Sequence, residues 1–281
     1  MTAVWRIDAG DGPRLATGRV GGPPEVLLPA GLRVTDLLRP GGWDRLPELT
    51  GAGEPVGAGY RVLAPVDEQD VWAAGVTYRR SRDARLAESG QLDAYDKVYV
   101  AERPELFWKA GPYEARGPGE TVGIRADSGW DVPEPELAVV VDATGRIVAM
   151  TIGNDVSSRS IEGENPLYLP QAKTYRHSLG LGPALVAREA LPDLMAGTVT
   201  MRVRRDGELV VDDAVPLSQM NREPPDLVRW LLRARDVPRG VVLLTGTGIV
   251  PDPGFTLAAG DEVRISITGL GELVNVVDVV G

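Results

Sequence analysis

Short apolar runs separated by turns dominate the pattern of hydrophobic and polar positions in this chain. Leu137–Val141 and Ile147–Ile152 are two such runs, and the Thr144-Gly145 turn between them predicts a β-hairpin. Further strands are predicted at Val4–Ile7, Val71–Val76, Thr198–Val203, Glu208–Val211, Val241–Thr245, Val263–Ile267 and Leu273–Val279. The pattern therefore favours a fold built mainly from β-strands.

Helical spacing is confined to a few segments. The clearest is Pro224–Arg235, which opens with proline and carries Leu227 and Leu231 on one face. A short helix is expected near Val34–Leu38, and Ser81–Ala94 also has helical spacing. The predicted fold class is mainly β with a few helices.

One stretch, Glu48–Gly59, is rich in glycine, glutamate and proline and is the best candidate for a domain boundary. We therefore expect a small N-terminal α+β domain over residues 1–65 and a catalytic domain over residues 66–281.

Composition excludes several classes of protein. The chain has no cysteine, which excludes disulfides and Cys-ligated zinc, and its formal net charge of −10 argues against a nucleic-acid partner. It contains no apolar run of transmembrane length, and Met1–Gly10 lacks the apolar core of a signal peptide. We expect a cytoplasmic protein with neither a membrane nor a nucleic acid as partner.

Two glutamates mark the start of the predicted hairpin. Glu134 and Glu136 are two residues apart, so on an extended strand both carboxylates face the same side. The return strand ends at Asp155, and pairing across the turn is expected to bring Asp155 beside Glu136. Three converging carboxylates would suit Mg²⁺ or Mn²⁺. From the residues alone, exposed acids that pair with nearby arginines are an equally valid interpretation.

Longer sequence motifs contain these three acidic residues and continue beyond them along the chain. They are Glu134-Pro-Glu136, Ile152-Gly-Asn-Asp155-Val-Ser-Ser-Arg159, Lys173 and Thr245-Gly-Thr247-Gly248. From about Val71 to the C-terminus, the chain resembles the catalytic domain of the fumarylacetoacetate hydrolase superfamily. The segments Ala74–Tyr78, Pro104–Phe107 and Gly163–Lys173 are similar to its branch of 2-keto-3-deoxy-D-arabinonate and D-xylonate dehydratases.

The resemblance implies a mixed β-sandwich or β-roll catalytic domain that follows a small N-terminal domain. It also implies Mg²⁺, with Mn²⁺ or Ca²⁺ as possible substitutes, held by Glu134, Glu136 and Asp155. The ion would chelate the carboxylate and oxo group of a small 2-oxo acid. A homodimer or homotetramer is expected on the same ground.

The carbon–carbon hydrolases of the superfamily use a His–Glu pair on a lid near the start of the catalytic domain. The matching stretch here, Tyr78–Tyr99, has no histidine, and the one histidine of the chain is His177. Non-hydrolytic chemistry is therefore favoured.

Chelation of a 2-oxo acid makes its C3 proton acidic and prepares loss of a hydroxyl from C4. Lys173 could act as the base or stabilise the enolate, although a structural ion pair is a serious alternative. Glu105 could be the acid/base partner, or an exposed acid at a strand end. The expected substrate contacts are Arg79, Ser81, Arg82, Tyr168 and Thr247.

The predicted function is Mg-dependent dehydration of a 2-keto-3-deoxy-pentonate to 2,5-dioxopentanoate. Alternatives on the same scaffold are an acylpyruvate hydrolase, an oxaloacetate decarboxylase and a dienoate isomerase. The alternative that is not an enzyme is a non-catalytic, metal-stabilised scaffold. An aldehyde product formed from a 2-oxo acid with Mg²⁺ would distinguish the dehydratase from all of these.

Overall fold

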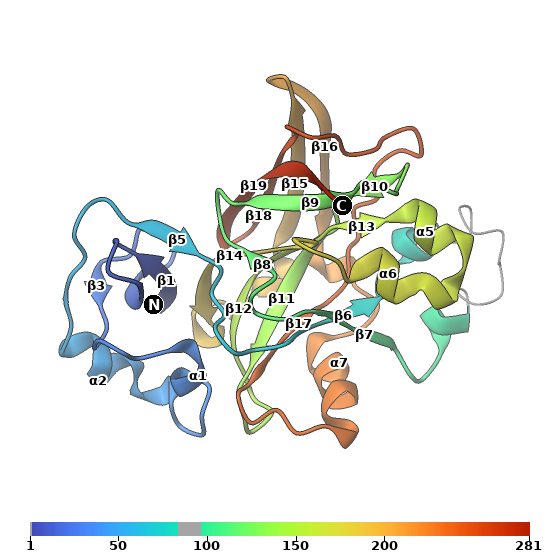
Figure 1. The fold of residues 1–281 in the computed structure, drawn as a ribbon. Helices are drawn as coiled ribbons and strands as arrows, with labels where there is room; N and C mark the ends of the chain where they lie inside the picture. The colour runs from blue at the N-terminus through green and yellow to red at the C-terminus, as the bar shows by residue number, and fades with distance from the viewer. Residues whose placement is uncertain (1, 84–96) are drawn as a thin grey trace.

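A computed structural model describes residues 2–83 and 97–281 of the chain (Figure 1). The described residues form sheets of twelve, five and two strands. The α-helices that lie wholly within the described residues are α1 (Val34–Leu37), α2 (Leu46–Gly51), α5 (Arg159–Glu164), α6 (Leu169–Lys173) and α7 (Pro224–Leu231). The prediction of a mainly β fold with a few helices is confirmed.

The twelve-stranded sheet is the frame of the molecule. Its main path runs in the order β4-β3-β2-β1-β14-β12-β11-β17-β6-β7, with β5 on β1 and β8 on β14. Its strands are β1 (Thr2–Asp8), β2 (Pro13–Arg19), β3 (Val26–Leu27), β4 (Glu54–Pro55), β5 (Arg61–Leu63), β6 (Val71–Gly75), β7 (Glu105–Ala110), β8 (Ala115–Arg116), β11 (Pro135–Val141), β12 (Ile147–Asp155), β14 (Leu179–Ala187) and β17 (Val241–Leu244).

The hairpin of β11 and β12 lies near the middle of this sheet. Every residue of β11 is buried, as expected for a Val-rich strand that is covered on both faces. Asp142 fixes the turn, because its Oδ1 accepts hydrogen bonds from the backbone N–H and the hydroxyl of Thr144. Gly145 follows with a φ of +88°, a conformation that favours glycine.

The five-stranded sheet follows the order β16-β15-β18-β19-β9. Its strands are β9 (Thr121–Arg125), β15 (Thr198–Arg205), β16 (Glu208–Pro216), β18 (Glu262–Ile267) and β19 (Gly271–Val280). β10 (Asp131–Val132) and β13 (Ser157–Ser158) form the small pair.

Alternate residues of the hairpin pack into two different cores. Val139 and Ile152 belong to a cluster that includes Met201 and Ile265 of the five-stranded sheet. Val140, on the opposite face, belongs to a second cluster, which includes the apolar residues of helix α1. The central sheet is therefore covered on both faces, and the ends of its strands are rigid positions for a site.

The leading strands join the large sheet through the pairing of β1 with β14. The division into domains at residues 1–65 and 66–281 stays a prediction. Helix α7 ends at Leu231 and continues as a 3-10 turn over Leu232–Ala234, close to the predicted segment. Most of the predicted helix Ser81–Ala94 lies outside the described residues.

Other 3-10 turns connect these elements, at Trp43–Arg45, Pro166–Tyr168, Arg188–Ala190, Leu194–Ala196 and Leu217–Gln219. Within the ranges 2–83 and 97–281, no helix combines the length and the apolar character needed to cross a membrane.

Candidate metal centre and active site

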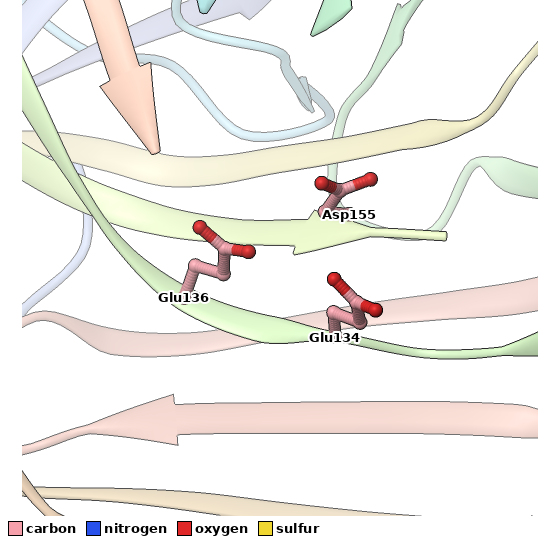
Figure 2. Close-up of side chains that lie close together, drawn as sticks. All are labelled: Glu134, Glu136 and Asp155. Carbon is pink, nitrogen blue, oxygen red and sulfur yellow. The ribbon is translucent and has the colours of Figure 1, made fainter. Parts of the chain in front are cut away.

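Three carboxylates converge at the end of the central hairpin. Glu134 directly precedes β11, Glu136 is its second residue, and Asp155 is the last residue of β12. One carboxylate oxygen from each lies within 4.8 Å of the others, and the three side chains lie close together at the ends of neighbouring strands (Figure 2). The residues are only 4, 2 and 1% exposed, so exposed acids at a turn do not describe them.

The register of the hairpin differs from the expected one. Glu136 lies opposite Gly153, and the backbone N–H of Asp155 donates to the carbonyl oxygen of Glu134 at 2.9 Å. Asp155 therefore lies beside Glu134 and diagonally from Glu136, not beside Glu136 as predicted. The reason is the path of the turn: the N–H of Asp142 donates to the carbonyl oxygen of Arg146, and the register then shifts by one residue between Val140 and Val141, which brings Glu134 opposite Asp155.

Protein donors surround the three carboxylates. Arg159 of helix α5 lies 3.0 Å from Glu134 Oε1, and Lys173 of helix α6 lies 2.6 Å from Glu134 Oε2. Lys109 Nζ lies 2.6 Å from Asp155 Oδ1. These contacts offset part of the repulsion among three buried anions, and they anchor Glu134 to helices α5 and α6 and Asp155 to β7.

Glu136 receives a backbone donor instead of a cation. The N–H of Gly246 donates to its Oε2 at 2.5 Å. Burial raises the pKa of Glu136 well above its usual range, and the nearby charges of Asp155 and Glu134 raise it further. A cation between the three residues would remove this penalty, because it would favour the ionised form of each.

The donor set fits a hard divalent ion. It consists of carboxylate oxygens alone, and three such ligands leave coordination positions for water and substrate. Thiolate and imidazole ligands, which favour zinc and copper, do not occur within this cluster.

A small cavity opens over the carboxylates. Of the predicted site residues, Ser81, Glu105, Lys173 and Thr247 line it together with the three acids. Glu105 lies against Gly75 of β6, where an added Cβ would be only 2.0 Å from its Oε2. A glycine at position 75 therefore leaves the space that the Glu105 carboxylate occupies.

Lys173 has the contacts expected of a functional lysine beside the acids. Its Nζ donates to Ser157 Oγ at 2.6 Å as well as to Glu134, and it lies 3.4 Å from Asp155 Oδ2. It is 3% exposed and still lines the cavity. The same contacts also describe a structural ion pair, so its catalytic role stays a prediction.

The other three residues that were predicted to contact substrate do not line the cavity. Arg79 and Arg82 do not line the cavity; they approach Asp83, and Arg82 also lies over the ring of Tyr99. Tyr168 is 37% exposed and is not part of the cavity wall. Their roles in binding substrate stay predictions.

Thr247 is held by its own loop. Its hydroxyl accepts the N–H of Ile249 and donates to the carbonyl oxygen of the same residue, both at 3.2 Å. This loop also carries Gly246, the donor to Glu136, so the Thr-Gly-Thr-Gly motif reaches the carboxylates through its backbone.

Sequence reasoning missed two charged residues of the site. Glu162 of helix α5 lines the cavity, and Lys109 lies in β7 with 0% of its side chain exposed. Burial lowers the pKa of Lys109, and the adjacent Asp155 opposes that shift. A lysine inside the apolar run Leu106–Ala110 was the available signal, because a charge within a buried strand requires a partner.

Known proteins resemble this chain in sequence and in fold. The sequence model for the "Fumarylacetoacetate (FAA) hydrolase C-terminal" domain matches residues 70–278. The chain belongs to the fumarylacetoacetate hydrolase family. The family predicted from the motifs around Glu134, Asp155 and Lys173 is thereby confirmed.

Members of this family with assigned names are similar over most of the chain. The "Probable 2-keto-3-deoxyxylonate dehydratase" of Haloferax volcanii is 50% identical over 77% of this chain and 74% of its own length. The 2-dehydro-3-deoxy-D-arabinonate dehydratase of Saccharolobus solfataricus is 38% identical over 76% of this chain and 74% of its own length.

A solved structure shares the whole fold. It is 2-keto-3-deoxy-D-arabinonate dehydratase complexed with magnesium and 2,5-dioxopentanoate, with a TM-score of 0.87 and 30% sequence identity. The match covers 100% of this chain and 99% of that one. The likeness therefore includes the N-terminal strands as well as the catalytic part.

Proposed function

We propose that this protein is a Mg²⁺-dependent hydro-lyase that converts a 2-keto-3-deoxy-pentonate into 2,5-dioxopentanoate and water. The observation that carries the proposal is a cavity in which Glu134, Glu136 and Asp155 lie together with Lys173 and Glu105. The relatives named as dehydratases of such pentonates support the choice of substrate.

Glu134, Glu136 and Asp155 would hold the ion. When bound, the ion would act as a Lewis acid that withdraws electrons from C2 of the chelated 2-oxo acid. Gly246 and Arg159 keep Glu136 and Glu134 in place through their contacts at 2.5 and 3.0 Å. Such outer contacts orient metal ligands and affect the affinity of the site.

Lys173 is the proposed base at C3. Its ammonium nitrogen lies at the edge of the carboxylate cluster and borders the cavity. A substrate bound through its carboxylate and oxo group would present C3 next to these oxygens, within reach of the same side chain. Lys173→Met should then remove the exchange of C3 protons with D₂O while the substrate still binds.

Glu105 is the proposed partner for the hydroxyl on C4. It would protonate that group as it leaves, so that C3 loses a proton, C4 loses hydroxide and one water is released. Transfer of a proton from C5 to C3 then converts the resulting alkene into the enol of the C5 aldehyde. Glu105→Gln should slow water loss more than C3 exchange.

The cavity wall offers hydroxyls to the rest of the substrate. Ser81 and Thr247 line it, and both are nearly buried at 5 and 4% exposure. We expect little hydrolysis of fumarylpyruvate-type acids, because Tyr78–Tyr99 contains no histidine for the hydrolase pair. A homodimer or homotetramer in the cytoplasm remains part of the proposal.

The decisive test is product formation. The purified protein is incubated with Mg²⁺ and with 2-keto-3-deoxy-D-arabinonate or 2-keto-3-deoxy-D-xylonate, and 2,5-dioxopentanoate is measured as an aldehyde. EDTA is the control that should stop the reaction. If neither substrate yields this product, the dehydratase assignment is wrong, and decarboxylation or isomerisation of a 2-oxo acid becomes the better hypothesis.

A further inference from the structure

Lys109 is a buried cation to which the proposed reaction assigns no step. Its Nζ contacts Asp155 Oδ1 at 2.6 Å, the carbonyl oxygen of Val156 at 3.0 Å and that of Lys173 at 2.5 Å. An ammonium group carries three N–H donors and no acceptor. The three oxygens therefore use all of its hydrogen-bonding capacity.

Each carboxylate of the cluster gives one oxygen to a protein donor on its outer side. Lys109 takes Oδ1 of Asp155, the N–H of Gly246 takes Oε2 of Glu136, and Arg159 takes Oε1 of Glu134. The second oxygens of Asp155 and Glu134 both lie beside Lys173, at 3.4 and 2.6 Å, so they face the same region. For Asp155, the oxygen that Lys109 does not contact is therefore Oδ2, on the side of Lys173 and Glu134, where an ion would bind.

We infer that Lys109 is a positioning residue that restricts Asp155 to a single ligand oxygen. The inference rests on the proposed metal function of Glu134, Glu136 and Asp155. An octahedral ion has six positions, and three protein oxygens leave three. Those three accommodate both oxygens of a 2-oxo acid and one water. If Asp155 bound through both oxygens, the place of the water would be lost.

The same ammonium also fixes the relation between the metal ligands and the proposed base. It joins Asp155, at the end of β12, to the backbone carbonyl of Lys173, at the end of helix α6. Ser178 Oγ donates to that carbonyl as well, at 2.9 Å. Lys109 thus anchors a ligand and a base that are 18 residues apart in the chain (173 − 155 = 18).

The test uses Mn²⁺ as a probe and the variant Lys109→Met, in which a side chain of similar length lacks the ammonium. Electron paramagnetic resonance in ¹⁷O-labelled water counts the exchangeable waters on the ion, with and without saturating pyruvate. We expect about three waters in the wild type and about one with pyruvate. The variant should show about two and none, because Oδ1 becomes a ligand.

The affinity for Mn²⁺ separates positioning from a purely structural role. Loss of a nearby cation should leave this affinity unchanged or higher in Lys109→Met. Lys173→Met is the matched control, since it removes the other buried ammonium next to Asp155 and should keep the full count of about three waters.

Three results would overturn the inference. The first is a wild-type protein with fewer than about three waters, and the second is a Lys109→Met variant whose water count is unchanged. The third is a fall in Mn²⁺ affinity of about tenfold in the variant, which would mark a general loosening of the site. If Lys109→Met does not fold, Lys109→Gln replaces it. None of these measurements involves turnover, so a failed dehydratase assay does not affect their interpretation.

Discussion

Asp155 and Glu136 belong to one cluster of carboxylates, but their side chains have different partners. Asp155 contacts two buried ammonium groups, those of Lys109 and Lys173, whereas Glu136 contacts a backbone N–H. Asp155→Asn removes the anion that both lysines face, and breaking a buried ion pair costs about 3–5 kcal/mol. Glu136→Gln removes a carboxylate whose ionised form burial disfavours.

We therefore predict that, in EDTA near neutral pH, Asp155→Asn lowers the free energy of unfolding by about 2 kcal/mol or more. Glu136→Gln, the same acid-to-amide change two positions from Glu134, should leave it unchanged or raise it. Urea unfolding monitored by circular dichroism measures both. If both variants lost the same free energy of unfolding, the ion pairs of Asp155 with Lys109 and Lys173 would not contribute to stability as predicted.

The buried carboxylate of Asp131, which is not one of the proposed metal ligands, should make the stability of the protein depend on pH. It is 2% exposed in β10, and burial raises its pKa from 3.8 to about 6. The folded protein therefore binds more protons than the unfolded chain between these values, and stability falls as the pH rises through them. Asp131→Asn should raise the melting temperature near pH 7, with a smaller gain near pH 4. Melting curves at constant ionic strength check this, and a gain independent of pH contradicts it.

The pairing of β6 with β7 shows how an element positions a catalytic group. Gly75 lies opposite Glu105, and an added Cβ would reach within 2.0 Å of the Glu105 carboxylate. That carboxylate is the far end of a flexible side chain, so Gly75→Ala should displace it without unfolding the sheet. We predict a loss in kcat of at least tenfold (about 1.4 kcal/mol), with slower water loss but retained C3 exchange.

Gly163→Ala is the matched control for this prediction. Gly163 lies in helix α5, and an added Cβ there meets nothing within 4 Å. Its kinetics should resemble those of the wild type. If Gly75→Ala also resembles the wild type, the position of Glu105 does not limit the reaction.

Elements with strong local patterns could be predicted from the sequence, and those set by tertiary contacts could not. The hairpin Leu137–Val141 to Ile147–Ile152 was predictable because apolar runs and a glycine turn coincide, and the strands extend it to Pro135 and Asp155. Helices α5 and α6 are short and do not show a full apolar face. Their contacts through Arg159 and Lys173 with Glu134 hold them in place, and no local pattern encodes those contacts.

At the scale of the whole molecule, strand parity in the sequence was enough to group Glu134, Glu136 and Asp155. Partners of these carboxylates come from β7, α5, α6 and the loop after β17. Long-range partners of this kind cannot be read from spacing along the chain, which is why Lys109 and Glu162 were missed. The site is thus a junction of elements that the rest of the fold brings together.

A junction of this kind should make global stability depend on the ion. An ion that binds the folded chain but not the unfolded one stabilises it by mass action, by about 2.7 kcal/mol at a hundred times its dissociation constant. We predict that Mg²⁺ raises the melting temperature of the wild type relative to EDTA, because it links the ends of β11 and β12 and relieves the repulsion among Glu134, Glu136 and Asp155.

Glu136→Gln should lose most of this increase while it keeps a melting temperature in EDTA at least equal to that of the wild type. Calorimetric scans with Mg²⁺, Ca²⁺ and EDTA measure the effect, and Asp131→Asn, which leaves the three ligands intact, is the control that should keep the full increase. If Mg²⁺ does not change the wild-type melting temperature at any concentration, the three carboxylates do not form a metal site in the folded protein.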